Sequence, residues 1–154
     1  MPLDISIPGI GELQLEHLLL DQNGTLSYRG DLIDGVAERL IQLRERLNIQ
    51  ILTADTFGTL EQVTAELGVS GQRVRDGQEK REFIERLGGE SCIAIGNGHN
   101  DVKMLQIARV AICVNGPEGM STAAAAAAHI ICPSITTALD LLLNERLLIA
   151  TMRS

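Results

Sequence analysis

Short apolar runs with strand character alternate along this chain with longer segments that carry a helical apolar face. That alternation is typical of units in which a helix connects two parallel strands. The expected strands are Leu15 to Leu20, Ile49 to Leu52, Arg73 to Arg75, Cys92 to Ile95, Val110 to Val114 and Ile130 to Cys132. The expected helices lie within Asp34 to Leu47, Leu60 to Leu67, Glu79 to Leu87, Val102 to Ala108 and Thr136 to Ile149. The sequence therefore predicts an α/β fold around a mostly parallel sheet.

The length of 154 residues suits one domain, so residues 1–154 are interpreted as a single unit. Ile5 and Ile7 lead into Pro8-Gly9-Ile10-Gly11, which favours a hairpin at the edge of the sheet. The alanine run 123–128 predicts a close-packed helix, because alanine is the best helix former.

Composition and charge argue against several classes of partner. The net charge is −7 and the Lys and Arg residues are scattered, so no nucleic acid or membrane partner is expected. No run approaches the roughly 18 apolar residues of a membrane span, and residues 1–11 lack a secretion signal. Cys92, Cys113 and Cys132 lie inside apolar runs, which indicates reduced core cysteines. We therefore expect a cytoplasmic protein.

Polar residues follow several of the expected strands, where ligands bind in open parallel sheets. Asp21 follows the first long strand, Thr53 follows the next, and Gly96 to Asp101 follow the strand that ends at Ile95. Lys80 lies in the first turn of a helix and can point to the same edge. Taken singly, Thr53 and Lys80 favour a structural interpretation, as a satisfied hydroxyl and a solvated charge. Asp21 with its loop, and Gly96 to Asp101, favour a functional one.

The order and spacing of these elements resemble the haloacid dehalogenase superfamily, and within it the phosphorylation domain of P-type ATPases. The resemblance extends from about Leu15 to the C-terminal helix. The matching segments are Asp21-Gln22-Asn23-Gly24-Thr25, Thr53 within Leu52-Thr53-Ala54-Asp55, Lys80, and Gly96-Asn97-Gly98-His99-Asn100-Asp101.

This resemblance implies a three-layer Rossmann-like fold, with helices on both faces of the sheet, and a hydrolase that forms an aspartyl-phosphate on Asp21. Thr53 and Lys80 would complete the catalytic set. The resemblance implies that Mg²⁺ is held by the Asp21 carboxylate and the backbone carbonyl of Asn23, with Asn97 and Asp101 completing or supporting the site. It places Asn23, Gly24, Thr25, Thr53, Lys80 and Asn100 around the phosphate, with the backbone amides of Gly24 and Thr25 as anion donors.

Two residues depart from the phosphatase pattern. Phosphatases of this superfamily carry aspartate at the position of Asn23, where it gives a proton to the leaving group, a contribution of ~10² to 10⁴ in rate. P-type ATPases also lack that acid, so we expect slow turnover and a preference for aryl and acyl phosphates, including ATP, over alkyl monoesters. Asn97 also replaces a usual acid, which predicts weak magnesium binding in the absence of phosphate.

Only Leu26 to Ile33 separate the Asp21 loop from the next helix, so no cap domain fits there. An uncapped site suits a phosphorylated small molecule or a phosphoprotein, and a homo-oligomer would cover it. The leucine-rich segment 139–149 predicts core packing and, for its remaining face, an interface. The turn at Tyr28 and Arg29 is either a flap that touches the leaving group or a plain surface turn. His99 lies in the loop near the expected phosphate and is a candidate proton donor.

The leading interpretation is a magnesium-dependent, capless phosphohydrolase. A phosphorylatable regulatory or binding module with little turnover is the alternative that Asn23 and Asn97 favour. A capless sugar-acid phosphatase is a further alternative, which the chain length supports and Asn23 opposes.

Overall fold

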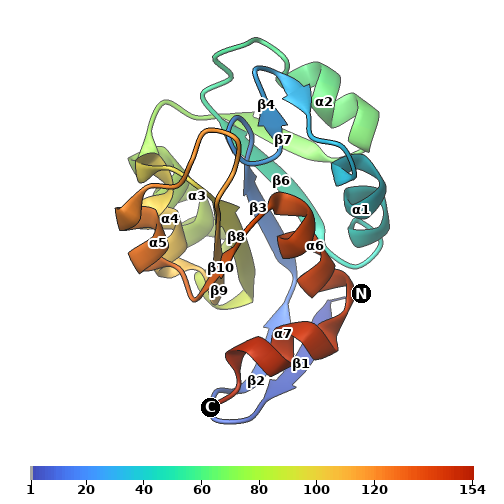
Figure 1. Ribbon diagram of the computed structural model, residues 1–154, viewed down its shortest axis with the longest axis vertical. Helices are drawn as coiled ribbons and strands as arrows, with labels where there is room; N and C mark the ends of the chain where they lie inside the picture. The colour runs from blue at the N-terminus through green and yellow to red at the C-terminus, as the bar shows by residue number, and fades with distance from the viewer. Residues whose placement is uncertain (1) are drawn as a thin grey trace.

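A six-stranded parallel sheet forms the centre of the computed structural model, which describes residues 2–154 (Figure 1). Its strands are β3 (His17–Asp21), β6 (Asn48–Thr53), β7 (Ser70–Arg73), β8 (Cys92–Gly96), β9 (Val110–Val114) and β10 (Ile130–Cys132). They lie in the order β10-β9-β8-β3-β6-β7. From β3 the chain continues to β6 and β7 on one side and later returns to β8 on the other. The switch point of the sheet is therefore next to β3, where ligands bind in folds of this kind.

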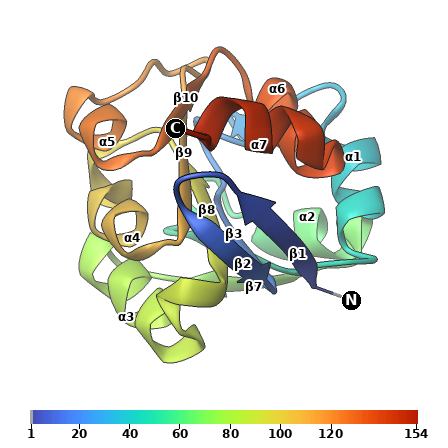
Figure 2. The ribbon, with the colours of Figure 1, turned by 90° about the horizontal axis from the view of Figure 1, so that it is seen from below.

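Helices cover both faces of this sheet, as the two views show (Figures 1 and 2). The helices α1 (Val36–Leu43), α2 (Leu60–Leu67), α6 (Ile135–Leu143) and α7 (Glu145–Met152) lie on one side, and α3 (Gly77–Leu87), α4 (Val102–Ile107) and α5 (Thr122–Ala127) on the other. Successive strand residues alternate between the two cores, since Leu18 and Leu20 pack in one and Leu19 packs in the other. The predicted three-layer α/β fold is confirmed.

Two hairpins lie outside the central sheet. The strands β1 (Leu3–Ile7) and β2 (Gly11–Leu15) confirm the expected hairpin, but they form a separate two-stranded sheet rather than an edge of the central one. Leu3, Ile5 and Ile7 bury one face of β1 in the core that α7 also joins, and Figure 1 shows α7 lying along the hairpin. The hairpin of β4 (Ser27–Tyr28) and β5 (Asp31–Leu32) connects the end of β3 to α1.

Two element predictions are wrong in their boundaries. The strand expected at 73–75 is β7, at 70–73, because pairing with β6 fixes its register from Gln50↔Ser70 to Thr53↔Arg73. The single helix expected over 136–149 is two helices, because Asn144 leaves helical geometry and caps α7 by accepting the N–H of Arg146.

The cysteines and the alanine run lie as the sequence predicts. All three cysteines are buried and free, and the alanine run forms α5. Most leucines of the C-terminal segment are buried, whereas Leu143 and Leu147 are exposed. No helix within residues 2–154 combines the length and apolar character that a membrane crossing requires.

Candidate active site

Asp21 is the last residue of β3, the strand next to the switch point of the sheet. It pairs in register with Leu52, so Thr53 follows one residue later on the neighbouring strand. Asp21, Thr53, Lys80, Asn97 and Asp101 are all buried polar residues. The structure therefore brings the predicted residues of four separate segments to one edge of the sheet, where polar atoms are not otherwise expected to be buried.

Lys80 connects two of these segments through its ammonium group. Lys80 Nζ lies 2.8 Å from Asp21 Oδ1 and 2.7 Å from Asp101 Oδ1, and the Lys80 side chain is 1% exposed. The second oxygen of Asp101 accepts the backbone N–H groups of Asn97 and Gly98, both at 3.0 Å. Both oxygens of Asp101 thus have partners, and its position fixes the Lys80 ammonium against Asp21.

The charges at this site shift the titration of Asp21 and of Lys80. Burial, together with the negative charge of Asp101, raises the pKa of Asp21 to about 6, although Lys80 and the Thr25 hydroxyl act in the opposite direction. Burial alone would lower the pKa of Lys80, but the two carboxylates raise it. Lys80 therefore stays a cation, and Asp21 is mostly ionised at neutral pH.

Thr25 joins the Asp21 loop to the loop after β8. Its hydroxyl lies 3.0 Å from Asp21 Oδ2 and 3.1 Å from Asn97 Oδ1, so its hydrogen is shared between the two oxygens. The amide nitrogen of Asn97 donates to the carbonyl of Gly119 at 3.1 Å. This network fixes the orientation of the Asn97 amide, with its oxygen toward the Thr25 hydroxyl and its nitrogen toward the Gly119 carbonyl.

Thr53 is placed to donate a hydrogen bond. Its side-chain oxygen accepts the backbone N–H of Asp55 at 3.0 Å, which leaves the hydroxyl hydrogen free for another acceptor. Asp55 is itself held by the N–H groups of Thr59 and Leu60 and by the guanidinium of Arg73. The turn after β6 is therefore rigidly fixed where Thr53 meets the site.

Two expected anion donors are already occupied. The Gly24 amide donates to the carbonyl of Ser27 at 2.8 Å, and the Thr25 amide donates to the carbonyl of Gln22 at 3.1 Å. The prediction that these two amides contact phosphate is therefore wrong, because the turn uses both of them to close on itself. Among the described residues, the amide of Asn23 has no carbonyl partner in this loop, which makes it the available donor.

His99 and Asn100 are predicted residues for which the structure shows no hydrogen bond to the Asp21 cluster. Both are exposed, and they line a groove of about 510 Å³ together with residues 76–78 and Lys103. Asp21, Thr53 and Lys80 are not among the lining residues of that groove. The structure thus gives no contact between the Asn100 side chain and the Asp21 cluster.

The loop between β9 and α5 also belongs to this edge, although the sequence alone did not indicate it. Ser121 donates its N–H to the carbonyl of Asn97 at 2.8 Å. Gly116 lies so close to the Asp21 loop that an added Cβ would be 2.1 Å from the carbonyl oxygen of Gly24. The glycine-rich composition of residues 115–119 was the only signal of such a close approach.

The oxygen atoms at this edge determine what cation could bind. Asn23 Oδ1 is buried and lacks a hydrogen-bond partner, and Asn97 Oδ1 faces the Thr25 hydroxyl. No group of three His, Cys, Asp or Glu residues within residues 2–154 is arranged to hold a metal. The donors near Asp21 are all oxygens, and such a set fits a hard divalent cation rather than zinc or copper.

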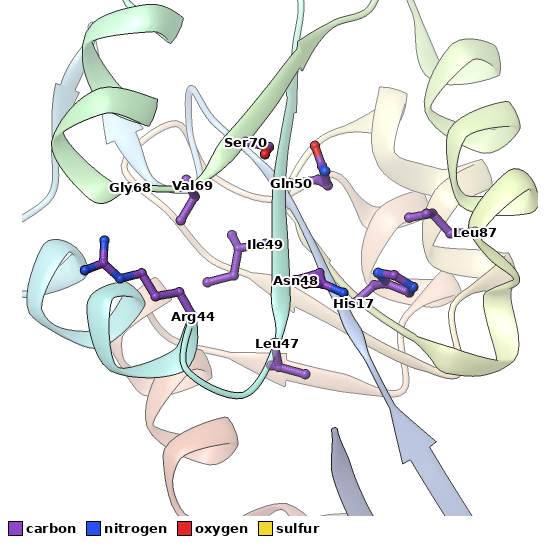
Figure 3. A pocket seen from close by; sticks show the side chains of 10 residues that line it. All are labelled: His17, Arg44, Leu47, Asn48, Ile49, Gln50, Gly68, Val69, Ser70 and Leu87. Atoms are coloured by element: carbon purple, nitrogen blue, oxygen red, sulfur yellow. The ribbon is translucent and has the colours of Figure 1, made fainter. Parts of the chain in front are cut away.

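A second hollow, of about 320 Å³, lies at the opposite end of the sheet (Figure 3). It is lined by His17, Asn48 and Ser70, which begin β3, β6 and β7, and Figure 3 shows the lining side chains spread along both sides of β6. It is therefore separate from the edge that carries Asp21.

Comparison with known proteins identifies the family. Residues 6–109 match the model of the haloacid dehalogenase-like hydrolases. The chain belongs to this family. A relative of the chain, uncharacterized protein MJ0073 of Methanocaldococcus jannaschii, is 44% identical over 78 residues, which are 48% of this chain and 84% of the relative.

Solved structures share the fold of this family member. A 3-deoxy-D-manno-octulosonate 8-phosphate phosphatase from Moraxella catarrhalis, in complex with magnesium ion, phosphate ion and the sugar acid, is 18% identical with a TM-score of 0.65, over 90% of this chain and 94% of that one. The catalytic domain of the CPx-ATPase CopB-B is 27% identical with a TM-score of 0.63, over 74% of this chain and 47% of that one. The resemblance to both phosphatases and P-type ATPases is confirmed.

Proposed function

We propose that this hydrolase is a phosphohydrolase in which Asp21 takes the phosphoryl group from its substrate. The observation that carries the proposal is the buried Asp21 carboxylate, held by the Lys80 ammonium at 2.8 Å and the Thr25 hydroxyl at 3.0 Å. A carboxylate oriented in this way is a nucleophile that needs no separate base, because it is mostly ionised at neutral pH.

The first step forms a bond between a carboxylate oxygen of Asp21 and phosphorus. The bond from phosphorus to the leaving oxygen breaks, and that oxygen departs with the electron pair. Thr53 has a free hydroxyl hydrogen for a phosphoryl oxygen, and the Lys80 ammonium offsets the negative charge on the reacting groups. In the second step, a water oxygen bonds to phosphorus and the bond from phosphorus to the Asp21 oxygen breaks. This restores the Asp21 carboxylate and releases inorganic phosphate, and the proton from water passes to the phosphate or to solvent.

A divalent cation fits the oxygens near Asp21, and Mg²⁺ is the proposed cofactor. Asp21, Asn23 and Asn97 would hold it. Asp101 accepts three hydrogen bonds, one more than Asp21, and acts by positioning Lys80. When bound, the cation neutralises charge on the transferring phosphoryl group. With Asp21 as the available carboxylate, affinity for Mg²⁺ in the absence of phosphate is weak.

Asn23 determines which substrates suit this site. An amide does not protonate a leaving group at neutral pH, so donors whose leaving group departs as a stable anion are preferred, namely aryl and acyl phosphates and ATP. The same residue makes the second step slow, because no carboxylate there activates water. We propose that the natural substrate is a phosphorylated small molecule or a phosphoprotein and that the protein acts in the cytoplasm. Residues 1–154 would form one domain, which works alone or as a homo-oligomer.

The experiment incubates the protein with Mg²⁺ and either 4-nitrophenyl phosphate, acetyl phosphate or glycerol phosphate. Released phosphate and acid-stable, hydroxylamine-sensitive phosphoprotein are both measured. Asp21→Asn should abolish both signals, whereas Asp76→Asn, the same change at the exposed cap of α3, should leave both unchanged. Release that persists in Asp21→Asn, or faster release from glycerol phosphate than from the other donors, contradicts the proposal.

A phosphorylatable regulatory module is a second candidate, because Asn23 and Asn97 occupy positions where the superfamily's phosphatases carry acids. It predicts stable phosphoprotein with no release of phosphate above the rate in Asp21→Asn. The same two measurements therefore separate the module from the enzyme.

A further inference from the structure

Two aromatic side chains in the segments that follow Asp21 and Thr53 are exposed to solvent. The chain contains one tyrosine, two phenylalanines and no tryptophan. Tyr28 is 41% exposed and ends β4, in the hairpin that follows β3, and Phe57 is 50% exposed and lies in the loop that follows β6. Strands β3 and β6 end at Asp21 and Thr53. Most of the aromatic surface of this chain is thus displayed at the carboxyl edge of the sheet.

The two loops are in contact with each other and with the nucleophile loop. An added Cβ at Gly30, in the turn of the β4–β5 hairpin, would lie 3.3 Å from the Cβ of Phe57 and 3.3 Å from the side chain of Thr59. The side-chain nitrogen of Gln22, the residue after Asp21, donates to the Thr59 hydroxyl at 2.9 Å. Figure 1 shows β4 beyond the carboxyl end of β3. The aromatic side chains are therefore joined to the site through short contacts.

Arg29 holds an unfavourable backbone conformation in this hairpin. Tyr28 pairs with Asp31, so Arg29 and Gly30 are the two turn residues, with φ of 53° and 90°. A turn with two positive φ angles favours Asn-Gly or Gly-Gly, and an arginine there is strained. The Arg29 guanidinium lies 5.1 Å from the centroid of the Tyr28 ring. Among the described residues, Arg29 is not one of the Lys and Arg side chains that form salt bridges, which are Arg39, Arg46, Arg73, Arg75, Lys80, Arg81 and Arg109.

We propose that Tyr28, Arg29 and Phe57 form a recognition rim that selects phosphate esters with a flat aromatic leaving group. This inference rests on the proposed function and adds its substrate class. Exposed aromatic rings and a guanidinium plane each offer a flat surface on which a ring stacks, and the guanidinium also favours the anion that departs. An aryl oxide departs without a proton, so the rim selects the leaving group that the absence of an acid at Asn23 requires.

Binding tests the rim without any turnover. Phenylphosphonate and methylphosphonate differ by one ring and are not hydrolysed, and titration calorimetry gives the affinity of each. Because Tyr28 is the single tyrosine and tryptophan is absent, intrinsic fluorescence reports on Tyr28 directly. We expect phenylphosphonate to change this fluorescence and to bind roughly tenfold more tightly than methylphosphonate, as ring stacking predicts.

Substitutions then separate recognition from folding. Phe57→Ala and Arg29→Asn should each reduce the preference for phenylphosphonate to within about threefold, while Arg29→Asn, which suits the turn, should not lower the melting temperature. Arg86→Asn is the matched control, because Arg86 lies over the Phe83 ring at 5.5 Å on α3, away from the rim. In turnover assays the same variants should lose activity on 4-nitrophenyl phosphate relative to acetyl phosphate.

Equal affinity for the two phosphonates in the wild type, or a preference that both rim variants retain, overturns the rim. Tight binding of phenylphosphonate without turnover of any donor would contradict the proposed hydrolysis and leave the rim supported. Turnover of acetyl phosphate without a ring preference would support the proposed hydrolysis and contradict the rim.

Discussion

Replacing Asp101 by asparagine tests whether the buried ion cluster holds the site together. Asp101 accepts three hydrogen bonds, from Lys80 Nζ at 2.7 Å and from the N–H groups of Asn97 and Gly98 at 3.0 Å each. Asparagine has the same shape but only one acceptor oxygen. If that oxygen faces Lys80, its amide nitrogen faces two backbone N–H groups, and if it faces those groups, its nitrogen meets the ammonium. Neither orientation satisfies all three donors.

The size of the loss follows from these contacts. A lost hydrogen bond to a charged group costs about 1.5–3 kcal/mol, and a buried donor left without a partner costs about 1–3 kcal/mol. Removing one carboxylate also relieves its repulsion of Asp21, which offsets part of that cost. We therefore expect Asp101→Asn to lower the free energy of unfolding by about 3 kcal/mol.

Urea unfolding of the metal-free protein, followed by circular dichroism, measures this change. The control is Asp76→Asn, because asparagine is as good an N-cap as aspartate and the exposed Asp76 accepts one N–H, from Glu79. The pKa of Asp21, followed by carboxyl NMR, should fall below about 6 in Asp101→Asn, since the neighbouring negative charge is gone. A loss of stability below about 0.5 kcal/mol, or a Asp21 pKa that does not fall, would refute the reasoning.

Two further substitutions examine the loops and the pH response. Gly116→Ala should lower stability by roughly 1–3 kcal/mol and reduce phosphate release, because its Cβ would clash with the carbonyl of Gly24. The control is Gly98→Ala, whose Cβ would meet only ordinary contacts at 3.4 Å and which should retain its stability in thermal melts. Partial desolvation, together with the positive charge of Arg109, lowers the pKa of His129, whose Nδ1 accepts the N–H of Ala111. Neutral His129 therefore stabilises the folded protein above the unfolded pKa of about 6.5, and this stabilisation is lost as pH falls. Because the side chain is exposed, it is worth less than about 1 kcal/mol. Unfolding at pH 7.5 and 5.5 should show a smaller acid loss in His129→Gln than in the wild type, and equal losses would contradict this role.

The sequence was sufficient to predict which residues meet at the edge of the sheet. Asp21 and Thr53 end adjacent parallel strands, and strands of this kind bring their carboxyl ends to one edge regardless of the details of packing. Lys80 could be placed because the first turn of α3 lies at the same edge. These predictions depend only on where each strand ends and each helix begins, and the pattern of apolar residues indicates both.

The sequence was not sufficient to predict how the loops use their hydrogen bonds. The amides of Gly24 and Thr25 close the turn on Ser27 and Gln22, a choice set by the local backbone path. Phe57 was not predicted to belong to the site, because its position beside Gly30 of the β4–β5 hairpin is a tertiary contact between segments nearly thirty residues apart. The register of β7 was also missed, since an edge strand with few buried residues carries little apolar pattern.

Asn97 shows that a departure from the superfamily pattern can be built into its surroundings. Its amide nitrogen donates to the Gly119 carbonyl at 3.1 Å, while its oxygen faces Thr25 and the Asp21 loop. A carboxylate at the same position would place an oxygen against that carbonyl, with no hydrogen between them, in a buried site. The acid could therefore return only if the loop around Gly119 moved. The Gly119 loop and Asn97 thus form one hydrogen-bonded unit. We expect weak cation binding both because this unit fixes the Asn97 amide and because a negative charge is missing.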